Sequence, residues 1–412
     1  MKNKQDEAKR TTRWALVDEK AEQRLFEAAG EDSVIKRAFG SEPKHEHPYN
    51  LYRDITSGPQ ALRDTFEWVK EDVAAVADEI VKRKIRRILA TGLGTSQFVA
   101  MPAAVGFCNL AHSDADQVDS AEFLTSNRDW DLPHTAFLAY SGSGFTVDCV
   151  RAAEKAKKEG AYTIGITSVA DSPLTKVCDA SILCAGGWDT GASDTFHLIT
   201  RLGASFLLAI EVGERTQPKQ LNYKDLREQL FAVPDLMKGK AKEIDSRCRN
   251  IARQYKNKRS FLVVGGGPNL GAAEEFALKL DEIANIPSKA MCPTRNIHGV
   301  TNLLDEDIVT VIIAPPSASY PWLMDVAKLT QVLKTPSIGI VTEGDDQLSK
   351  IMDNVVRLPV SDETFFTLPV AFVGELLAYY CAVEQGLNPD CGRYNIPKYA
   401  RGLNMLFPPD SH

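Results

Sequence analysis

Two short segments rich in glycine and hydroxyl residues carry the clearest chemistry in this sequence. Gly92-Leu93-Gly94-Thr95-Ser96 follows the apolar run 88–90, and Ser141-Gly142-Ser143-Gly144-Phe145-Thr146 follows the apolar run 136–140. In each case a buried-strand pattern ends at the segment and a helical pattern begins after it. Glycine lets a backbone approach a ligand closely, free N–H groups at a helix N-terminus point outward, and hydroxyls add donors. The two segments therefore predict a cradle for a tetrahedral oxyanion, held mainly by hydrogen bonds.

A single loop of this kind is more often an ordinary helix start that is capped by Ser or Thr. Two such loops in consecutive strand–helix units favour a binding site instead. Neither has the lysine of the nucleotide phosphate loop, so the sequence does not indicate a nucleoside triphosphate site. The loops do not distinguish a phosphate from a sulfonate, because both groups are tetrahedral oxyanions.

The composition limits the function classes. The 412 residues are 44% hydrophobic and 25% charged, which is ordinary for a globular protein and long enough for two domains. The formal net charge is −7 and there is no basic stripe, so we expect no nucleic acid partner. No apolar stretch approaches membrane-spanning length, and residues 1–10 are charged rather than signal-like. We therefore expect no membrane partner and a cytoplasmic protein.

Cysteine and histidine patterns give no sign of a metal centre. The eight cysteines have no C-x-x-C spacing and lie mostly in apolar runs, which predicts reduced core residues. His45 and His47 form an H-x-H pattern between prolines, with no further ligands nearby. We expect no metal and no cofactor.

Alternating strand and helix patterns predict an α/β fold with two tandem domains, each a parallel sheet with helices on both faces. The strand patterns lie at residues 85–90, 117–119, 135–140, 162–167, 261–265, 308–314, 337–342 and 355–358. Between the halves, charge and proline content indicate a crossover. We divide the chain into an N-terminal helical extension (1–50), a first domain with the anion loops (51–213), a crossover (214–240), a second domain (241–385) and a C-terminal tail (386–412). An amphipathic helix is expected over 62–81, after Gly58-Pro59.

A glycine-rich segment in the second half invites comparison with a dinucleotide fold. Gly265–Gly271 follows a strand and opens a helix, but its spacing is G-x-G-x-x-x-G and Pro268 lies within the turn. The acidic residue expected at the end of a second strand is missing. An NAD-dependent oxidoreductase is therefore disfavoured.

Several ordered motifs show that residues 50–405 resemble the sugar isomerase (SIS) family. The similarity is to the isomerase half of glucosamine-6-phosphate synthase and, more weakly, to fructosamine-6-phosphate deglycases. Gly94-Thr95-Ser96 resembles that family's Gly-Thr-Ser loop, 141–146 its Ser-Gln-Ser-Gly-Glu-Thr phosphate loop, and Gly191-Ala192-Ser193 its Val-Ala-Ser turn. In the second half, 277–283 matches Ala-Leu-Lys-Leu-Lys-Glu-Ile, Ile297-His298-Gly299 falls at Lys-His-Gly-Pro, and Asn395-Ile396-Pro397-Lys398 resembles Asn-Leu-Ala-Lys.

The resemblance implies flavodoxin-like SIS domains, a homodimer with shared active sites, and a sugar phosphate or other C6-anionic sugar as the small-molecule partner. It implies a phosphate site formed by Thr95, Ser96, Ser141, Ser143 and Thr146. Ser193 would line the sugar. Glu282 would move a proton between C1 and C2, with Lys279 beside it. His298 would assist ring opening, reaching across from the neighbouring subunit, and Lys398, in a tail that completes the site, would contact the carbonyl and could form a Schiff base.

Departures from the family pattern leave the substrate open. Arg295 stands where the family has an acid, which suggests a second anionic group on the substrate. Met1-Lys2-Asn3 offers no N-terminal cysteine nucleophile, so glutamine-dependent ammonia transfer is not expected. The segment Asn388-Pro389-Asp390 is similar to the tail of fructoselysine-6-phosphate deglycases.

Taken without the family, Glu275, Lys279 and Glu282 share one helical face that would ordinarily be solvated. With the family resemblance taken into account, we expect an aldose–ketose isomerase whose substrate is a C6-phosphorylated or similarly C6-anionic hexose, for example a sulfonated one. The enzyme would transfer the proton through an enediol. The alternatives are a fructosamine-6-phosphate deglycase and a non-catalytic sugar-phosphate-binding module.

Overall fold

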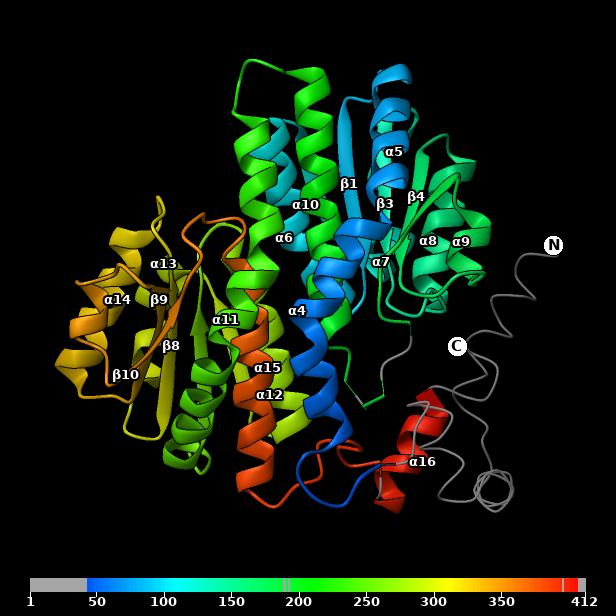
Figure 1. The fold of residues 1–412 in the computed structure, drawn as a ribbon. Coiled ribbons are helices and arrows are strands. Elements are labelled where there is room, and N and C mark those ends of the chain that lie inside the picture. Colours follow the sequence, from blue (N-terminus) through cyan, green and yellow to red (C-terminus); the bar gives the residue numbers. More distant parts are fainter. Residues whose placement is uncertain (1–42, 188–189, 192, 395, 407–412) are drawn as a thin grey trace.

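The computed structural model describes residues 43–187, 190–191, 193–394 and 396–406. Over these residues the chain forms two parallel five-stranded sheets with helices, which confirms the predicted α/β fold. Counted within each half, both sheets have the strand order 2-1-3-4-5, the order of flavodoxin-like folds. In Figure 1 the sheets lie on the two sides of a central group of helices.

The first sheet contains β1 (Arg87–Gly92), β2 (Asp114–Asp119), β3 (Thr135–Tyr140), β4 (Tyr162–Thr167) and β5 (Ala180–Leu183). Its helices are α4 (Asn50–Trp68), α5 (Lys70–Lys82), α6 (Thr95–Ala111), α7 (Ser120–Thr125), α8 (Val147–Lys158), α9 (Pro173–Val177) and α10 (Phe196–Thr216). A short 3-10 turn, η1 (Leu132–His134), precedes β3.

The second sheet contains β6 (Ser260–Val264), β7 (Ser288–Met291), β8 (Ile308–Ala314), β9 (Ser337–Thr342) and β10 (Asn354–Leu358). Its helices are α11 (Tyr223–Tyr255), α12 (Asn269–Ala284), α13 (Pro293–Ile297), α14 (Tyr320–Leu333), α15 (Thr367–Glu384) and α16 (Pro397–Leu406). The 3-10 turns are η2 (Val300–Leu303) and η3 (Leu348–Lys350).

The central strands form because their residues are apolar on both sides. All residues of β3 and β8 are buried, as expected for a parallel strand that is covered by helices on both faces. Helices α8 and α14 pack on the outer faces, whereas α6, α10, α12 and α15 lie between the sheets. The largest apolar cluster includes residues of these inner helices and both sheets. The two halves therefore share one core.

Some local expectations were wrong. Gly58-Pro59 lies inside α4 rather than before a helix, and the expected helix over 62–81 is divided between α4 and α5. The crossover proposed at 214–240 overlaps α11, which continues to Tyr255 with Pro234 inside it. The edge strands β5 and β7 were not predicted, because each has only four residues of mixed polarity.

Helices α10 and α15 are long and apolar enough to cross a membrane by length and composition, contrary to the sequence expectation. Their apolar windows are, however, 94% and 89% buried inside the protein. Their place in the fold is that of core helices, in contact with α6, α11 and α12. The cysteines are free, as predicted, although Cys108 is exposed and Cys292 is partly exposed.

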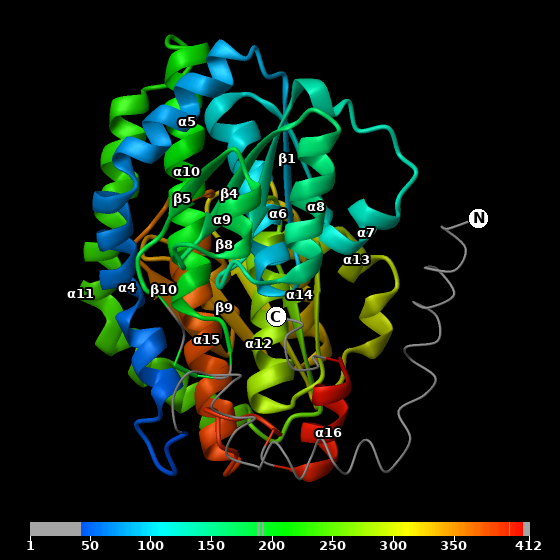
Figure 2. The ribbon, with the colours of Figure 1, turned by 90° about the vertical axis from the view of Figure 1, so that its right-hand side faces the viewer.

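The glycine-rich segment after β6 has a packing role in this fold. A Cβ at Gly271 would lie 2.4 Å from Cδ of Pro102, so glycine is needed where α12 crosses α6. A Cβ at Gly267 would lie 2.7 Å from Glu363 Oε1, so a carboxylate already faces this turn. The close contact of α12 with α6, which lie one above the other in Figure 2, brings the second half of the chain to the anion loops of the first.

Candidate active site

The two predicted anion loops follow β1 and β3, which are neighbours in the first sheet. The strand order reverses at this pair, because the chain continues from β1 to β2 on one side of the sheet and from β3 to β4 on the other side. Ligands of open α/β sheets bind at such a switch point, at the carboxyl ends of the strands. The structure therefore places both loops where the topology predicts a site.

Hydrogen bonds within the second loop set the directions of its hydroxyls. Gly144 N donates to Ser141 Oγ at 3.0 Å, and Ser141 Oγ lies 2.9 Å from Thr146 Oγ1. Phe145 N donates to Ser143 Oγ at 3.1 Å. Because the Ser143 oxygen accepts this bond, its hydroxyl hydrogen can be donated to a ligand.

A buried lysine on α12 joins the two halves of the chain. Lys279 Nζ donates to Glu282 Oε1 at 2.6 Å, to Ser193 Oγ at 2.9 Å and to Thr95 Oγ1 at 3.0 Å, and it lies 2.9 Å from Glu275 Oε1. Thr95 is the first residue of α6, and Ser193 lies shortly before α10. The charged face of α12 is thus not fully solvated, as its sequence alone would suggest, because Glu275 and Lys279 are buried against the first predicted anion loop while Glu282 stays partly exposed. We call Thr95, Ser193, Glu275, Lys279 and Glu282 the lysine cluster.

The charged groups of the lysine cluster strongly influence one another's pKa values. Burial disfavours a charged Lys279, but Glu275 and Glu282 outweigh burial and hold its pKa well above the ordinary value. Lys279 is therefore a fixed cation rather than a nucleophile. Burial raises the pKa of Glu275 to about 7, even though Lys279 opposes the shift.

Accessibility separates the two carboxylates. The side chain of Glu275 is 1% exposed and that of Glu282 is 36% exposed. Glu282 Oε1 accepts from Ser193 Oγ at 2.5 Å, which fixes the direction of the carboxylate. Of the two, only Glu282 combines a defined orientation with access for a substrate.

A second buried carboxylate positions the loop that carries Ser193. Asp54, on α4, accepts from Thr190 N at 2.8 Å, from Thr190 Oγ1 at 2.6 Å and from Gly191 N at 2.9 Å. Asp390 holds the start of α4 in turn, since its carboxylate accepts from Asn50 N and Leu51 N at 3.0 and 2.8 Å. Helix α4 therefore connects the C-terminal segment to the site.

Three predicted site residues lie outside both the lysine cluster and the two predicted anion loops. Arg295 and His298 are exposed at α13, after the edge strand β7. Lys398 is exposed on α16, where its Nζ lies 5.1 Å from the ring centre of Tyr399. The C-terminal segment does approach Glu282, because a Cβ at Gly392 would lie 3.6 Å from the Glu282 backbone oxygen. Asn395, in the predicted tail motif, lies outside the described residues.

Ser96, which was predicted, contacts a second group of charged residues that the sequence analysis missed. Its Oγ accepts from Arg201 Nη1 at 2.5 Å, and Arg201 also pairs with Asp194. Burial works against an ionised Asp194, but Arg201, with smaller effects of His197 and Lys279, lowers its pKa. A lone arginine within the apolar run of α10 was the available signal, because a buried arginine requires partners.

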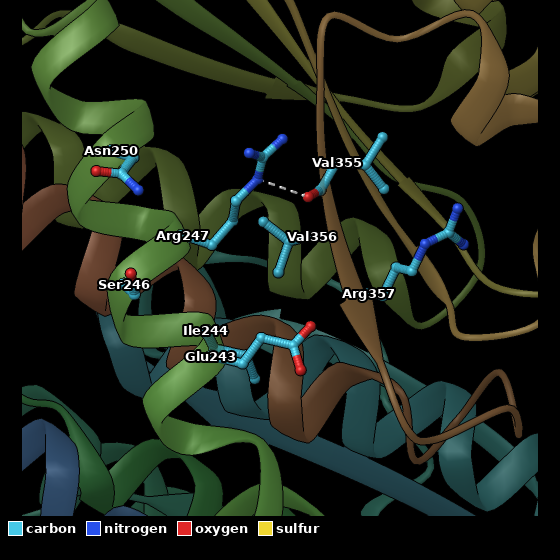
Figure 3. Close-up of a pocket in the computed structure, with 8 residues that line it drawn as sticks. All are labelled: Glu243, Ile244, Ser246, Arg247, Asn250, Val355, Val356 and Arg357. Carbon is cyan, nitrogen blue, oxygen red and sulfur yellow. Dashed lines mark hydrogen bonds between the residues drawn. The ribbon is translucent and has the colours of Figure 1, made fainter.

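A groove of about 510 Å³ lies elsewhere in the molecule, between α11 and β10. Figure 3 shows Arg247 on α11 reaching the edge strand, where its Nε donates to Val355 O at 2.9 Å. Arg357 extends away from Arg247 on the other side of the strand. None of the site residues predicted from the sequence lines this groove.

Comparison with known proteins gives the family. The model of the SIS domain matches residues 81–208 and 254–388. The chain belongs to the SIS domain family. It is 28% identical over 348 residues to a glutamine–fructose-6-phosphate aminotransferase (isomerizing) from Thermococcus kodakarensis, covering 84% of this chain and 57% of the relative. The corresponding protein of Thermotoga maritima is 26% identical over 356 residues, covering 84% of this chain and 58% of the relative. This SIS protein thus spans less than two thirds of these relatives.

Solved structures support the same fold. The C-terminal domain of glucosamine-fructose-6-phosphate aminotransferase from Francisella tularensis matches with a TM-score of 0.78 at 20% identity, covering 85% of this SIS protein and 99% of that chain. Tagatose-6-phosphate ketose/aldose isomerase from Escherichia coli matches with a TM-score of 0.70 at 18% identity, covering 85% and 96%. At these identities the likeness establishes the fold.

Proposed function

We propose that this SIS protein is an aldose–ketose isomerase that acts at C1 and C2 of a hexose with an anionic group at C6, a phosphate or a sulfonate. The observation that carries the proposal is the hydrogen-bonded path from Glu282 through Lys279 to Thr95. It joins an oriented, accessible carboxylate to the first anion loop. A general base at a fixed place relative to an anion site suits a substrate that is held by one end and deprotonated at the other.

The proposed proton transfer uses the geometry of the lysine cluster. Glu282 removes the proton at C2 of the aldose, the bonding electrons form the enediol, and the carbonyl oxygen gains a proton. The proton on Glu282 then goes to C1, while the C2 hydroxyl releases a proton that balances the one taken up by the carbonyl oxygen, and the C2 carbonyl of the ketose forms. Lys279 and Ser193 hold the Glu282 carboxylate in one direction. Lys279 also provides a positive charge next to the developing anion.

The remaining roles require a second subunit or a movement of the tail. His298 is exposed and directly follows α13, so a role in ring opening suits a homodimer in which it serves the neighbouring site. Lys398 is exposed on α16, so contact with the carbonyl requires the tail to close over the sugar. Arg295 would then meet a second anionic group. These three residues, the domain boundaries and a cytoplasmic location remain part of the proposal.

The names of the relatives point to the same chemistry. The curated relatives include isomerizing fructose-6-phosphate aminotransferases, and one structural neighbour is a tagatose-6-phosphate ketose/aldose isomerase. The chain covers 57% of the first relative, and the proposal concerns isomerisation alone.

The test is turnover of C6-phosphorylated and C6-sulfonated aldoses, ketoses and fructosamines, followed by NMR in deuterated water. We expect interconversion of an aldose and a ketose, with deuterium at C2 of the aldose. Release of an amine from a fructosamine 6-phosphate would indicate the deglycase, and binding without turnover would indicate the non-catalytic module.

Glu282→Gln tests the base. Glutamine keeps the shape of glutamate but accepts no proton, so kcat should fall about 10²–10⁴-fold with nearly constant affinity. The matched control is Glu384→Gln, which changes an ion-paired glutamate on α15, bonded to Arg253 Nε at 2.9 Å. If Glu282→Gln kept more than about a tenth of wild-type turnover, the base would lie elsewhere.

A further inference from the structure

A fully buried arginine lies behind the anion loops. Arg201 occupies the inner helix α10 and has no exposed side-chain surface. Its Nη1 donates to Ser96 Oγ at 2.5 Å, its Nε donates to His197 O at 2.9 Å, and its Nη2 pairs with Asp194. An arginine is always ionised, so this is a permanent charge next to a predicted anion site.

The bond from Arg201 fixes the role of Ser96. A hydroxyl has one hydrogen to donate, and an arginine can only donate. Ser96 Oγ must therefore accept from Arg201, and its own hydrogen is directed to another group. Ser96 lies in the first turn of α6, directly after the glycine loop, so a bound anion is the acceptor that this position offers.

Asp194 and Arg201 also reach the second anion loop. A Cβ at Gly142 would lie 3.2 Å from Asp194 Oδ2, 3.4 Å from His197 Nδ1 and 3.6 Å from Arg201 Nη2. Glycine leaves this space at the position where the resembled phosphate loop has glutamine. Charged groups from α10 and the segment before it thus pack directly against the loop backbone.

Asp194 brings a negative charge to the same place. Its Oδ2 pairs with Arg201, and its buried Oδ1 accepts no hydrogen bond within the described part of the chain. Arg201 and Lys279 attract this carboxylate, Glu275 repels it, and His197, whose Nδ1 lies 3.8 Å from Oδ1, attracts it when the imidazole is protonated. A carboxylate here offsets Arg201 and repels an anion in proportion to the charge of that anion.

We propose that Arg201 and Asp194 form a charge-compensated pair that sets the selectivity of the anion site for the charge of its ligand. Arg201 aligns the Ser96 hydroxyl as a donor, and Asp194 weakens the binding of doubly charged tetrahedral groups more than that of singly charged ones. Both residues act through position and charge rather than on the reacting carbons. The inference rests on the proposed function only in taking these loops as the anion site.

The test uses methyl phosphate, which is mainly a dianion at pH 8, and methanesulfonate, which is a monoanion, with binding to the full-length chain followed by NMR. Asp194→Asn should lower the Kd of methanesulfonate about three- to tenfold. It should lower the Kd of methyl phosphate by about the square of that factor, because the electrostatic energy of the ligand doubles with its charge. Arg201→Met should weaken both anions, the dianion more. Asp179→Asn is the control, since Asp179 bonds Thr163 at the opposite end of the sheet.

The outcomes separate this inference from the proposed function. If Asp194→Asn leaves both affinities unchanged, or changes them equally, the charge-compensated pair is overturned, even if sugar turnover is observed. If the wild-type chain binds neither probe, the anion site itself is wrong and the proposed function loses its support. If the charge variants do not fold, as judged by thermal melting, Ser96→Ala remains. It must weaken both probes about tenfold, and unchanged binding would refute the alignment by Arg201.

Discussion

Replacing Lys279 with methionine should cost far more stability than replacing an exposed lysine. Lys279 is 1% exposed and bonds Glu282, Ser193 and Thr95. Removal of one partner from a buried ion pair leaves the other charge uncompensated and costs about 3–5 kcal/mol. Lys224→Met is the control, because its Nζ lies 3.8 Å from Glu228 Oε1 and its side chain is 84% exposed. An exposed pair of this kind contributes at most about 1 kcal/mol.

Urea denaturation at pH 7.5, followed by circular dichroism, measures both changes. A second variant identifies the cause, because Glu275→Gln removes the buried acidic group that Lys279→Met leaves without its charged partner. In the double variant Lys279→Met/Glu275→Gln, we expect recovery of at least about 1 kcal/mol relative to the sum of the single changes. A loss below about 1 kcal/mol for Lys279→Met, or strictly additive single changes, would refute the idea of a coupled, buried charge cluster.

Three further outcomes are expected. Ser143→Ala removes a donor to a charged group and should raise KM about ten- to hundredfold, and an unchanged KM in steady-state kinetics would count against the placement of the anion. If His298 acts in trans, mixed Glu282→Gln and His298→Ala subunits should regain up to about a quarter of wild-type activity after random pairing, whereas a monomer by light scattering would contradict the shared site. The pKa of Glu275 is raised from 4.5 to about 7 in the folded state, so the folded state binds this proton more tightly and stability falls as pH rises through that window. Urea denaturation from pH 4.5 to 7.5 should show that Glu275→Gln lacks this decline, and parallel curves for variant and wild type would show that another group titrates.

Local sequence patterns were sufficient for much of the fold. Strands β3, β4, β8 and β9 were predicted to the residue, because each is an uninterrupted run of residues buried on both faces. The glycine and hydroxyl loops after β1 and β3 were also evident, since the residues needed to approach an anion are adjacent in the chain. Their positions at the switch point then followed from the alternation of strands and helices.

Sequence patterns whose meaning depends on contacts with distant parts of the chain were harder to interpret. The charged face of α12 reads like a solvated face, yet Glu275 and Lys279 are buried, because another part of the chain supplies their partners. The proline at 59 was taken as a helix boundary, although α4 continues through it. The glycines from 265 to 271 resemble part of a nucleotide motif, but Gly271 serves a close helix crossing.

The sequence by itself determined the parallel α/β architecture, and it predicted the two anion loops and, through the family resemblance, the site residues Lys279 and Glu282. Only the tertiary structure decided which of these residues meet. Lys279 reaches Thr95 across 184 residues because α12 packs on α6 between the two sheets. The partnership of Arg201 with Ser96 and Asp194 likewise exists only after folding. The physical reason is that a buried charge must find opposite charges and hydrogen-bond partners in space, and periodicity along the chain does not encode which distant segment will provide them.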